Sequence, residues 1–383
     1  MNFTFKNITY TKKYYLKHKN RIEEDLKRCN KIENECFYYC LNLKEINIPN
    51  SITEIGINCF YMCENLTKID IPNSVIKIGK NCFEYCSNLK EINIPNSITE
   101  MNCGCFSDCI NLTKINIPNS VKKLSGWCFS NCSNLKEINI PNSVKKLGDG
   151  CFNECIVLGT LNNLESLNLT KIINEHNLNS FSLKIPNSVT KIGNYCFRGC
   201  LNLQKIDISN SVKEMGYGCF AGCSNLKEIK ISNSVIVLFN YCFCKCTNLT
   251  KIEIPNLVTK ICDGCFADCS NLKEIKFLKS NESMNLIKKM CNGCFRNCIN
   301  LTKIGVLSDL GPSDAGIPNS VTKIGYQCFK NCSNLKEINI PNSVKELGDG
   351  CFGNCVSLTK INIPNSVTKI GNYCFKGCIN LEH

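Results

Sequence analysis

The cysteines are the residues of this chain with the greatest capacity for chemistry. The 383 residues include 33 cysteines but only 3 histidines. Twenty-eight of the cysteines stand at the two ends of a CFxxC motif, and five lie outside it: Cys29, Cys103, Cys244, Cys262 and Cys291. Thiols can ligate zinc, form disulfides, carry redox chemistry or pack as small apolar groups, so their spacing has to decide between these roles.

The spacing favours packing over chemistry. Structural zinc sites commonly use tight CxxC pairs, often with histidine, whereas this chain has CxxxC pairs and few histidines. Two cysteines four residues apart within one turn poorly match the geometry of a disulfide. We therefore favour buried structural thiols in a reducing compartment. Inter-repeat disulfides and metal binding remain alternatives, so the second candidate function is a thiol-rich metal-binding or redox protein.

The CFxxC motif recurs at a fixed interval. The steps from Cys36 to Cys151, from Cys196 to Cys265 and from Cys328 to Cys374 are all 23 residues. A constant period of this size is typical of a solenoid, whose units bury their apolar faces only by stacking. The first cysteines of the fourteen motifs are Cys36, Cys59, Cys82, Cys105, Cys128, Cys151, Cys196, Cys219, Cys242, Cys265, Cys294, Cys328, Cys351 and Cys374.

Residues 89–109, LKEINIPNSITEMNCGCFSDC, show what one unit contains. The LxxIxI stretch alternates as a short strand does, and Pro95 ends it. A VxxI segment follows, and in most units a glycine comes next, for which we expect positive φ. CFxxC is expected to make about one helical turn. Its phenylalanine should be the largest core side chain of each unit: Phe60, Phe83, Phe106, Phe129, Phe152, Phe197, Phe220, Phe243, Phe266, Phe295, Phe329, Phe352 and Phe375.

The pattern LxxIxIPxxVxxIGxxxFxxC resembles the BspA-type leucine-rich repeat. The resemblance implies an α/β repeat solenoid, a leucine-rich-repeat arc. Its parallel β-sheet would line the concave face, with short strands, turns and single helical turns on the convex face. We expect a basic polar lead or cap at residues 1–28. Residues 29–383 would then form about fifteen units, with a degenerate, irregular unit at 156–185.

The resemblance also bears on function. Proteins of this family are surface or secreted proteins, or proteins of unknown role, and some bind host matrix proteins. This implies a non-enzymatic scaffold for protein-protein interaction, or an adhesin-like binding protein. The chain departs from the family by carrying cysteine before every motif phenylalanine, where alanine is common, and by lacking a visible signal peptide. We therefore expect a cytoplasmic protein by default, with the cell surface reachable only by an unconventional route.

The distribution of charge argues against nucleic acid as a partner. The net charge is +13, but nine lysines and arginines fall within residues 1–31. In the strands, the residue before the central isoleucine alternates between Glu and Lys from unit to unit, except at the neutral Thr160 and Ser182, which leaves no basic stripe. No catalytic motif, cofactor motif or membrane-spanning segment is visible, so we expect no enzyme activity, catalytic residue, metal site or cofactor. The partner should be a protein, and the chain itself a monomer unless the exposed ends of the solenoid associate.

Two adjacent units depart from the period and indicate where that partner would bind. Insertions near residues 278–285 and 307–316 lengthen the steps after Cys265 and Cys294 to 29 and 34 residues. We expect both insertions to protrude at one edge of the sheet as a binding rim. The alternative is a neutral lengthening of surface loops, which costs only about 0.6 kcal/mol per doubling. The candidate contacts are Lys251, Glu274, Lys276, Lys279, Glu282, Asp309 and Asp314.

Overall fold

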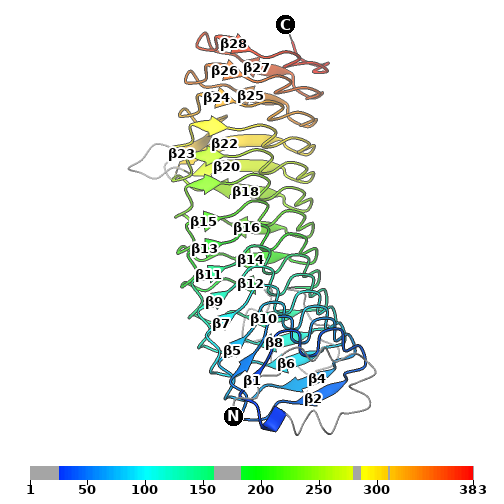
Figure 1. Cartoon of the computed structure of the whole chain (residues 1–383). Coiled ribbons are helices and arrows are strands. Elements are labelled where there is room, and N and C mark those ends of the chain that lie inside the picture. The colour runs from blue at the N-terminus through cyan, green and yellow to red at the C-terminus, as the bar shows by residue number, and fades with distance from the viewer. Residues whose placement is uncertain (1–25, 159–182, 279–285, 309–310, 383) are drawn as a thin grey trace, which may run out of the picture. The chain divides into compact units, whose positions relative to one another are not determined.

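The computed structural model describes residues 26–158, 183–278, 286–308 and 311–382 (Figure 1). The chain divides into two compact units, Met1–Phe181 and Ser182–His383. The boundary falls in the stretch whose sequence departs from the repeat. Residues 159–182 of the degenerate unit, for which we expected irregular packing, lie outside the described part of the chain.

Within each unit the chain is a repeat solenoid of parallel strands, as predicted (Figure 1). Each repeat, named here by the first cysteine of its CFxxC motif, has a longer strand, a two-residue strand and the CFxxC turn. In the first unit the longer strands are β2 (Glu45–Asn47), β4 (Lys68–Asp70), β6 (Glu91–Asn93), β8 (Lys114–Asn116) and β10 (Glu137–Asn139). Its two-residue strands are β1 (Lys31–Ile32), β3 (Glu54–Ile55), β5 (Lys77–Ile78), β7 (Glu100–Met101), β9 (Lys123–Leu124) and β11 (Lys146–Leu147).

The second unit repeats this plan with longer strands in its middle. The strands equivalent to the longer strands β2–β10 of the first unit are β12 (Leu183–Lys184), β14 (Lys205–Asp207), β16 (Glu228–Lys230), β18 (Lys251–Ile254), β20 (Glu274–Leu278), β22 (Lys303–Ser308), β25 (Glu337–Asn339) and β27 (Lys360–Asn362). An additional strand, β23 (Gly311–Ala315), follows β22. The two-residue strands are β13 (Lys191–Ile192), β15 (Glu214–Met215), β17 (Val237–Leu238), β19 (Lys260–Ile261), β21 (Lys289–Met290), β24 (Lys323–Ile324), β26 (Glu346–Leu347) and β28 (Lys369–Ile370).

The motif phenylalanines form the centre of both cores. Their rings stack on one another from repeat to repeat, with centroids 5.1 Å apart for Phe37–Phe60 and 5.6 Å apart for Phe220–Phe243. Phe37 and Phe220 are fully buried. Because the repeats are in register, each ring covers the face of the next, and the stack runs through each unit as one column.

The cysteine that closes the motif bonds to the repeat before it in most repeats. The thiol of Cys246, for example, donates to the carbonyl of Phe220 at 3.3 Å, and the Cys269 thiol donates to that of Phe243 at 3.1 Å. All 33 cysteines are free thiols, and all but Cys36, Cys103, Cys244 and Cys378 are buried. Burial raises the pKa of Cys246 well above its ordinary value and that of Cys223 to about 12. The structure thus supports structural thiols as the role of these motif cysteines.

The expectation of a helical turn at CFxxC is wrong. Among the described residues only Leu26 and Lys27 are helical. The N–H of Phe220 donates to the carbonyl of Cys242 in the following repeat at 2.8 Å, so this N–H is used in a hydrogen bond between repeats and not in one within a helical turn. The residue before the closing cysteine is left-handed, as at Tyr85 with φ 60°, which no α-helix permits. The segment is therefore a turn, and the solenoid has almost no helical component.

The role expected for the glycines after VxxI is also wrong. Gly56, Gly79, Gly148, Gly193 and Gly371 are not among the residues with positive φ. They allow a close approach instead: a Cβ on Gly79 would lie 2.4 Å from the carbonyl carbon of Gly56 in the preceding repeat. These glycines therefore suit the close spacing between repeats rather than a backbone conformation of their own.

The part of the chain that the structure describes contains no helix with the length and apolar character needed to cross a bilayer.

Candidate functional site

The longer strands present an exposed polar face. In β16 the central Ile229 is buried, whereas Glu228 and Lys230 on either side of it are exposed. This alternation follows from the two-residue period of a strand, which turns every second side chain outward. Each repeat thereby contributes two outward side chains to a polar surface on this side.

The alternation of charge along that surface is confirmed by the register of the strands. Lys251 of β18 is paired with Glu274 of β20, and Glu274 with Lys303 of β22. Ion pairs also form along single strands: Lys251 Nζ lies 2.8 Å from Glu253 Oε1, and Lys276 Nζ lies 3.6 Å from Glu274 Oε2. Exposed pairs of this kind stabilise the fold by at most about 1 kcal/mol each, so they shape the surface more than they hold the fold together.

The two-residue strands carry a second row of charge, in which lysines are interrupted by glutamates. The interrupting glutamates pair with lysines of neighbouring repeats. Glu346 Oε2 lies 2.8 Å from Lys323 Nζ, and Glu346 Oε1 lies 3.1 Å from Lys369 Nζ. Bonding to Lys323 and then to Lys369 lowers the pKa of Glu346 below its ordinary value. The row is thus partly neutralised, which weakens it as a site for polyanions.

The four-stranded sheet β18–β20–β22–β23 is where the solenoid departs most from its repeat. β20 and β22 have 5 and 6 residues, whereas β25 and β27 have 3 each. β23 arises from the second insertion and pairs antiparallel with β22, with Val306 opposite Asp314. Part of this insertion therefore widens the sheet by one strand, where sequence analysis expected a protruding loop.

The structure brings three of the seven predicted contacts together. Lys251 is exposed, and Glu274 and Lys276 are half-buried on the neighbouring strand, all on β18 and β20. The backbone of Asp314 lies on β23, but its side chain is outside the described part of the structure. Lys279, Glu282 and Asp309 lie outside the described residues.

The surface of the CFxxC turns carries further groups that sequence analysis did not identify. In the first unit, tyrosine rings gather there: Tyr38 and Tyr61 stack with centroids 4.9 Å apart, and Tyr61 and Tyr85 meet edge-to-face at 5.6 Å. Glu84 and Asp108 lie beside them, and the Asp108 carboxylate accepts hydrogen bonds from Ser107 and Asn131, both at 2.7 Å. Burial, and then the Asp108 carboxylate, raise the pKa of Glu84 to about 6.

We predict a pH-dependent contribution to stability from Glu84. Because its folded pKa of about 6 exceeds the ordinary value of 4.5, the folded state binds the proton more tightly than the unfolded chain does. The resulting stabilisation is complete below about pH 4.5 and is lost as the pH rises through about 6. Glu84→Gln should remove this loss. The Tm of the variant minus the Tm of the wild type should therefore increase as the pH rises from 4.5 to 6.5. Thermal unfolding across this range measures the effect. Glu64→Gln, at an exposed carboxylate of the preceding repeat, is the control, and identical pH profiles for wild type and Glu84→Gln would contradict the prediction.

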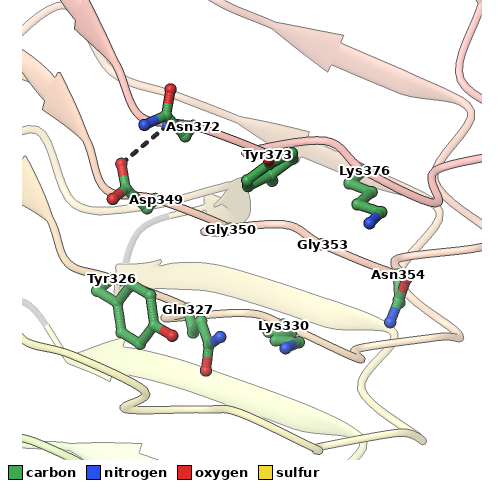
Figure 2. Close-up of a pocket in the computed structure, with 10 residues that line it drawn as sticks. All are labelled: Tyr326, Gln327, Lys330, Asp349, Gly350, Gly353, Asn354, Asn372, Tyr373 and Lys376. Carbon is green, nitrogen blue, oxygen red and sulfur yellow. Dashed lines mark hydrogen bonds between the residues drawn. The ribbon is translucent and has the colours of Figure 1, made fainter.

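A pocket of about 300 Å³ lies on the turns of the second unit (Figure 2). Side chains of the Cys328 and Cys374 repeats flank a middle repeat that contributes Gly350 and Gly353. The Asp349 carboxylate accepts the N–H of Asn372 at 2.8 Å, and the Lys376 ammonium lies 5.3 Å from the centroid of the Tyr373 ring. The lining residues are Tyr326, Gln327, Lys330, Asp349, Gly350, Gly353, Asn354, Asn372, Tyr373 and Lys376. With phenol rings and two ammonium groups, the pocket can hold a small aromatic or anionic group.

Among the described residues, no three or more His, Cys, Asp or Glu side chains are grouped so as to hold a metal ion. The chemistry that the exposed groups offer is ion pairing, hydrogen bonding and aromatic contact.

Comparison with known proteins agrees with this architecture. The family model described as "BspA type Leucine rich repeat region" matches residues 30–159, 171–302 and 312–383, in six copies. None of the curated proteins matches the chain. Among solved structures, a leucine-rich repeat protein from Bacteroides ovatus is 29% identical, with a TM-score of 0.69 over 89% of this chain and 86% of that one. A leucine-rich cell surface protein from Faecalibacterium prausnitzii is 25% identical, with a TM-score of 0.47 over 92% of this chain and 82% of that one.

Proposed function

Because the chain belongs to the BspA-type leucine-rich repeat family, we propose that it is a non-enzymatic binding scaffold whose protein partner contacts the sheet β18–β20–β22–β23. Solenoids of this kind present extended rigid surfaces, and their stability needs nothing beyond the regular repeat. A departure from the repeat is therefore a natural place to look for a binding function.

The observation that carries the proposal is the concentration of departures in one sheet. The longest strands and the added antiparallel strand β23 all occur there. Lengthening two consecutive strands and adding a third widens the polar face, which is the change that a binding surface requires. Loops between the regular strands could have lengthened anywhere else at little cost.

The outward charges define the chemistry of the partner. Lys251, Glu274 and Lys276 place both signs within two neighbouring strands. A partner surface that also alternates in sign would fit this pattern, whereas a uniformly charged polymer would meet repulsion at every second strand. Association should accordingly weaken as the salt concentration rises.

The test compares charge reversals in two sheets of the same unit. We expect Lys251→Glu combined with Lys276→Glu to weaken binding of a partner recovered with the full chain by at least about tenfold, or roughly 1.4 kcal/mol. The matched control reverses Lys205 and Lys230, which occupy the corresponding positions on β14 and β16. Titration of the purified partner against each variant gives the Kd. An equal loss in both double variants, or no loss in the first, would reject this sheet as the binding site.

A further inference from the structure

Two of the five cysteines outside CFxxC occupy equivalent places in neighbouring repeats. Cys262 directly follows β19 and Cys291 directly follows β21. Eight of the fourteen repeats carry glycine at this place: Gly56, Gly79, Gly148, Gly193, Gly216, Gly325, Gly348 and Gly371. Cysteine occurs here only in these two consecutive repeats. Neither the fold nor the proposed binding function accounts for this pair.

The structure places the two cysteines side by side, directly after two paired strands. β19 and β21 are paired in register at Ile261 and Met290, and the N–H of Cys291 donates to the carbonyl of Ile261 at 3.0 Å. The protonation of each thiol depends on the other, because Cys291 raises the pKa of Cys262 and Cys262 lowers that of Cys291. Neighbouring strands lie about 4.7–4.9 Å apart, within the range of Cα separations that disulfides span.

The equivalent glycines show which way these side chains point. A Cβ on Gly325 would lie 2.6 Å from the carbonyl carbon of Cys291, and one on Gly348 would lie 2.5 Å from the nitrogen of Tyr326. At this place in the repeat, the Cα–Cβ direction therefore runs toward the preceding repeat. The side chain of Cys291 thus extends toward the repeat that carries Cys262.

The environment of the pair differs from that of the fully buried motif cysteines, and it is shared only by Cys374 and Cys378 of the last described repeat, where Cys351 and Cys355 lower the pKa in the same way. Cys262 and Cys291 are each 6% exposed. The Cys262 thiol, together with the positive charges of Lys260 and Lys289, lowers the pKa of Cys291 to about 7. Cys219 and Cys242 also influence each other across two repeats, but both are fully buried, and burial raises the pKa of Cys219 well above its ordinary value. Only a thiolate attacks a disulfide, so the Cys219 pair should be inert under conditions where the Cys262 pair reacts.

We propose that Cys262 and Cys291 form a thiol–disulfide exchange site that takes small-molecule disulfides such as oxidised glutathione. The Cys291 thiolate attacks one sulfur of the oxidised glutathione, whose S–S bond breaks to release one glutathione thiolate. Cys262 then loses its proton, and its sulfur attacks Cys291 and displaces the second glutathione. The two protons lost by the cysteines are taken up by the two glutathione thiolates. The protein dithiol is oxidised and the glutathione disulfide is reduced, with two electrons exchanged.

The disulfide would connect the Cys265 and Cys294 repeats of the second unit. Its S–S bond would close the chain from residue 262 to residue 291, which includes β20 and the first insertion. Oxidation should therefore restrict the separation of β19 from β21, while leaving the longer strands exposed. The proposal does not depend on the identity of the protein partner.

The experiment exposes the reduced full-length protein to oxidised glutathione at pH 7.4, blocks remaining thiols with N-ethylmaleimide, and maps tryptic peptides by tandem mass spectrometry. The expected product joins peptide 261–273 to peptide 290–296 through Cys262 and Cys291. It should form at least about tenfold faster than any link between Cys219 and Cys242. Cys262→Ser should stop the reaction at the first step and accumulate glutathione on Cys291.

A second variant separates reactivity from folding. Cys291→Gly restores the residue that most other repeats carry, so it should retain the unfolding transition while abolishing the link. Formation of the Cys262–Cys291 link no faster than a Cys219–Cys242 link would overturn the proposal. So would a link that joins Cys291 to Cys294, whose thiol donates to the Cys291 carbonyl at 3.0 Å. Failure of Cys262→Ser to retain glutathione on Cys291 would equally reject the assigned order of attack.

Discussion

Replacing Phe220 by alanine should destabilise the second unit by about 3–5 kcal/mol. The ring is fully buried and stacks on Phe197 and Phe243, with centroids 5.3 and 5.6 Å apart. Its removal deletes two aromatic contacts and leaves a cavity. The backbone around it is fixed by bonds between repeats, such as the 2.8 Å bond from Phe220 N–H to Cys242 O, so the cavity cannot collapse. Equilibrium unfolding in urea, followed by circular dichroism, measures the loss.

Phe375 supplies the matched comparison for this prediction. Its ring stacks on Phe352 at 5.7 Å, and it is only half-buried in the structure. Phe375→Ala should therefore cost about half as much as Phe220→Ala or less, because the transfer and cavity terms both shrink with burial. Equal losses for the two variants would contradict a stability that depends on stacking between neighbouring repeats.

The parts of the fold that sequence predicted are those fixed by the period. A constant 23-residue interval requires equivalent residues to meet in neighbouring repeats, so it predicted that Lys251 would face Glu274. The same interval predicted parallel strands with a buried central isoleucine, as found at Ile229. These features follow from the pattern alone, because any stacked arrangement of identical units must satisfy them.

The parts that sequence did not predict depend on where backbone donors find their partners. CFxxC has the composition of a helical turn, but its phenylalanine N–H bonds to the next repeat, as that of Phe220 does with Cys242. Such bonds exist only after stacking, and a single unit gives no sign of them. The pocket is hidden for the same reason, because residues from three repeats, including Tyr326, Gly350 and Tyr373, must come together to form it.

The proposed binding sheet β18–β20–β22–β23 also combines features that the sequence predicted with one that it did not. Sequence placed Lys251, Glu274 and Lys276 in neighbouring repeats, and the strands β18 and β20 bring them together. It did not predict that the second insertion would contribute β23, because GPSDA has a composition typical of a turn. Pairing with the extended β22 offers this segment main-chain hydrogen bonds that its local sequence does not require.

The largest remaining effect that we predict comes from the glycine at the close approach between repeats. Gly348→Ala should destabilise the second unit by about 1–3 kcal/mol, the usual range for an overpacked site. The added Cβ would lie 2.5 Å from the nitrogen of Tyr326, and backbone atoms cannot swing aside as a flexible side chain does. The two repeats must instead separate locally, which lengthens bonds such as the one from Gly348 N–H to Ile324 O, at 2.8 Å. The loss is bounded because six repeats place other residues here, among them Cys262 and Cys291.

Gly353→Ala, in the same repeat, isolates the effect of the close approach. The nearest atom to its added Cβ is the Gly350 oxygen at 3.3 Å, and two other repeats carry Ala221 and Ala267 at the equivalent position. This variant should lie within about 0.5 kcal/mol of the wild type, or gain slightly from the lower entropy of its unfolded chain. Urea unfolding of the two alanine variants side by side measures the difference. If both variants lose the same free energy of unfolding, the glycines after VxxI do not set the spacing between repeats, and local backbone entropy accounts for them instead.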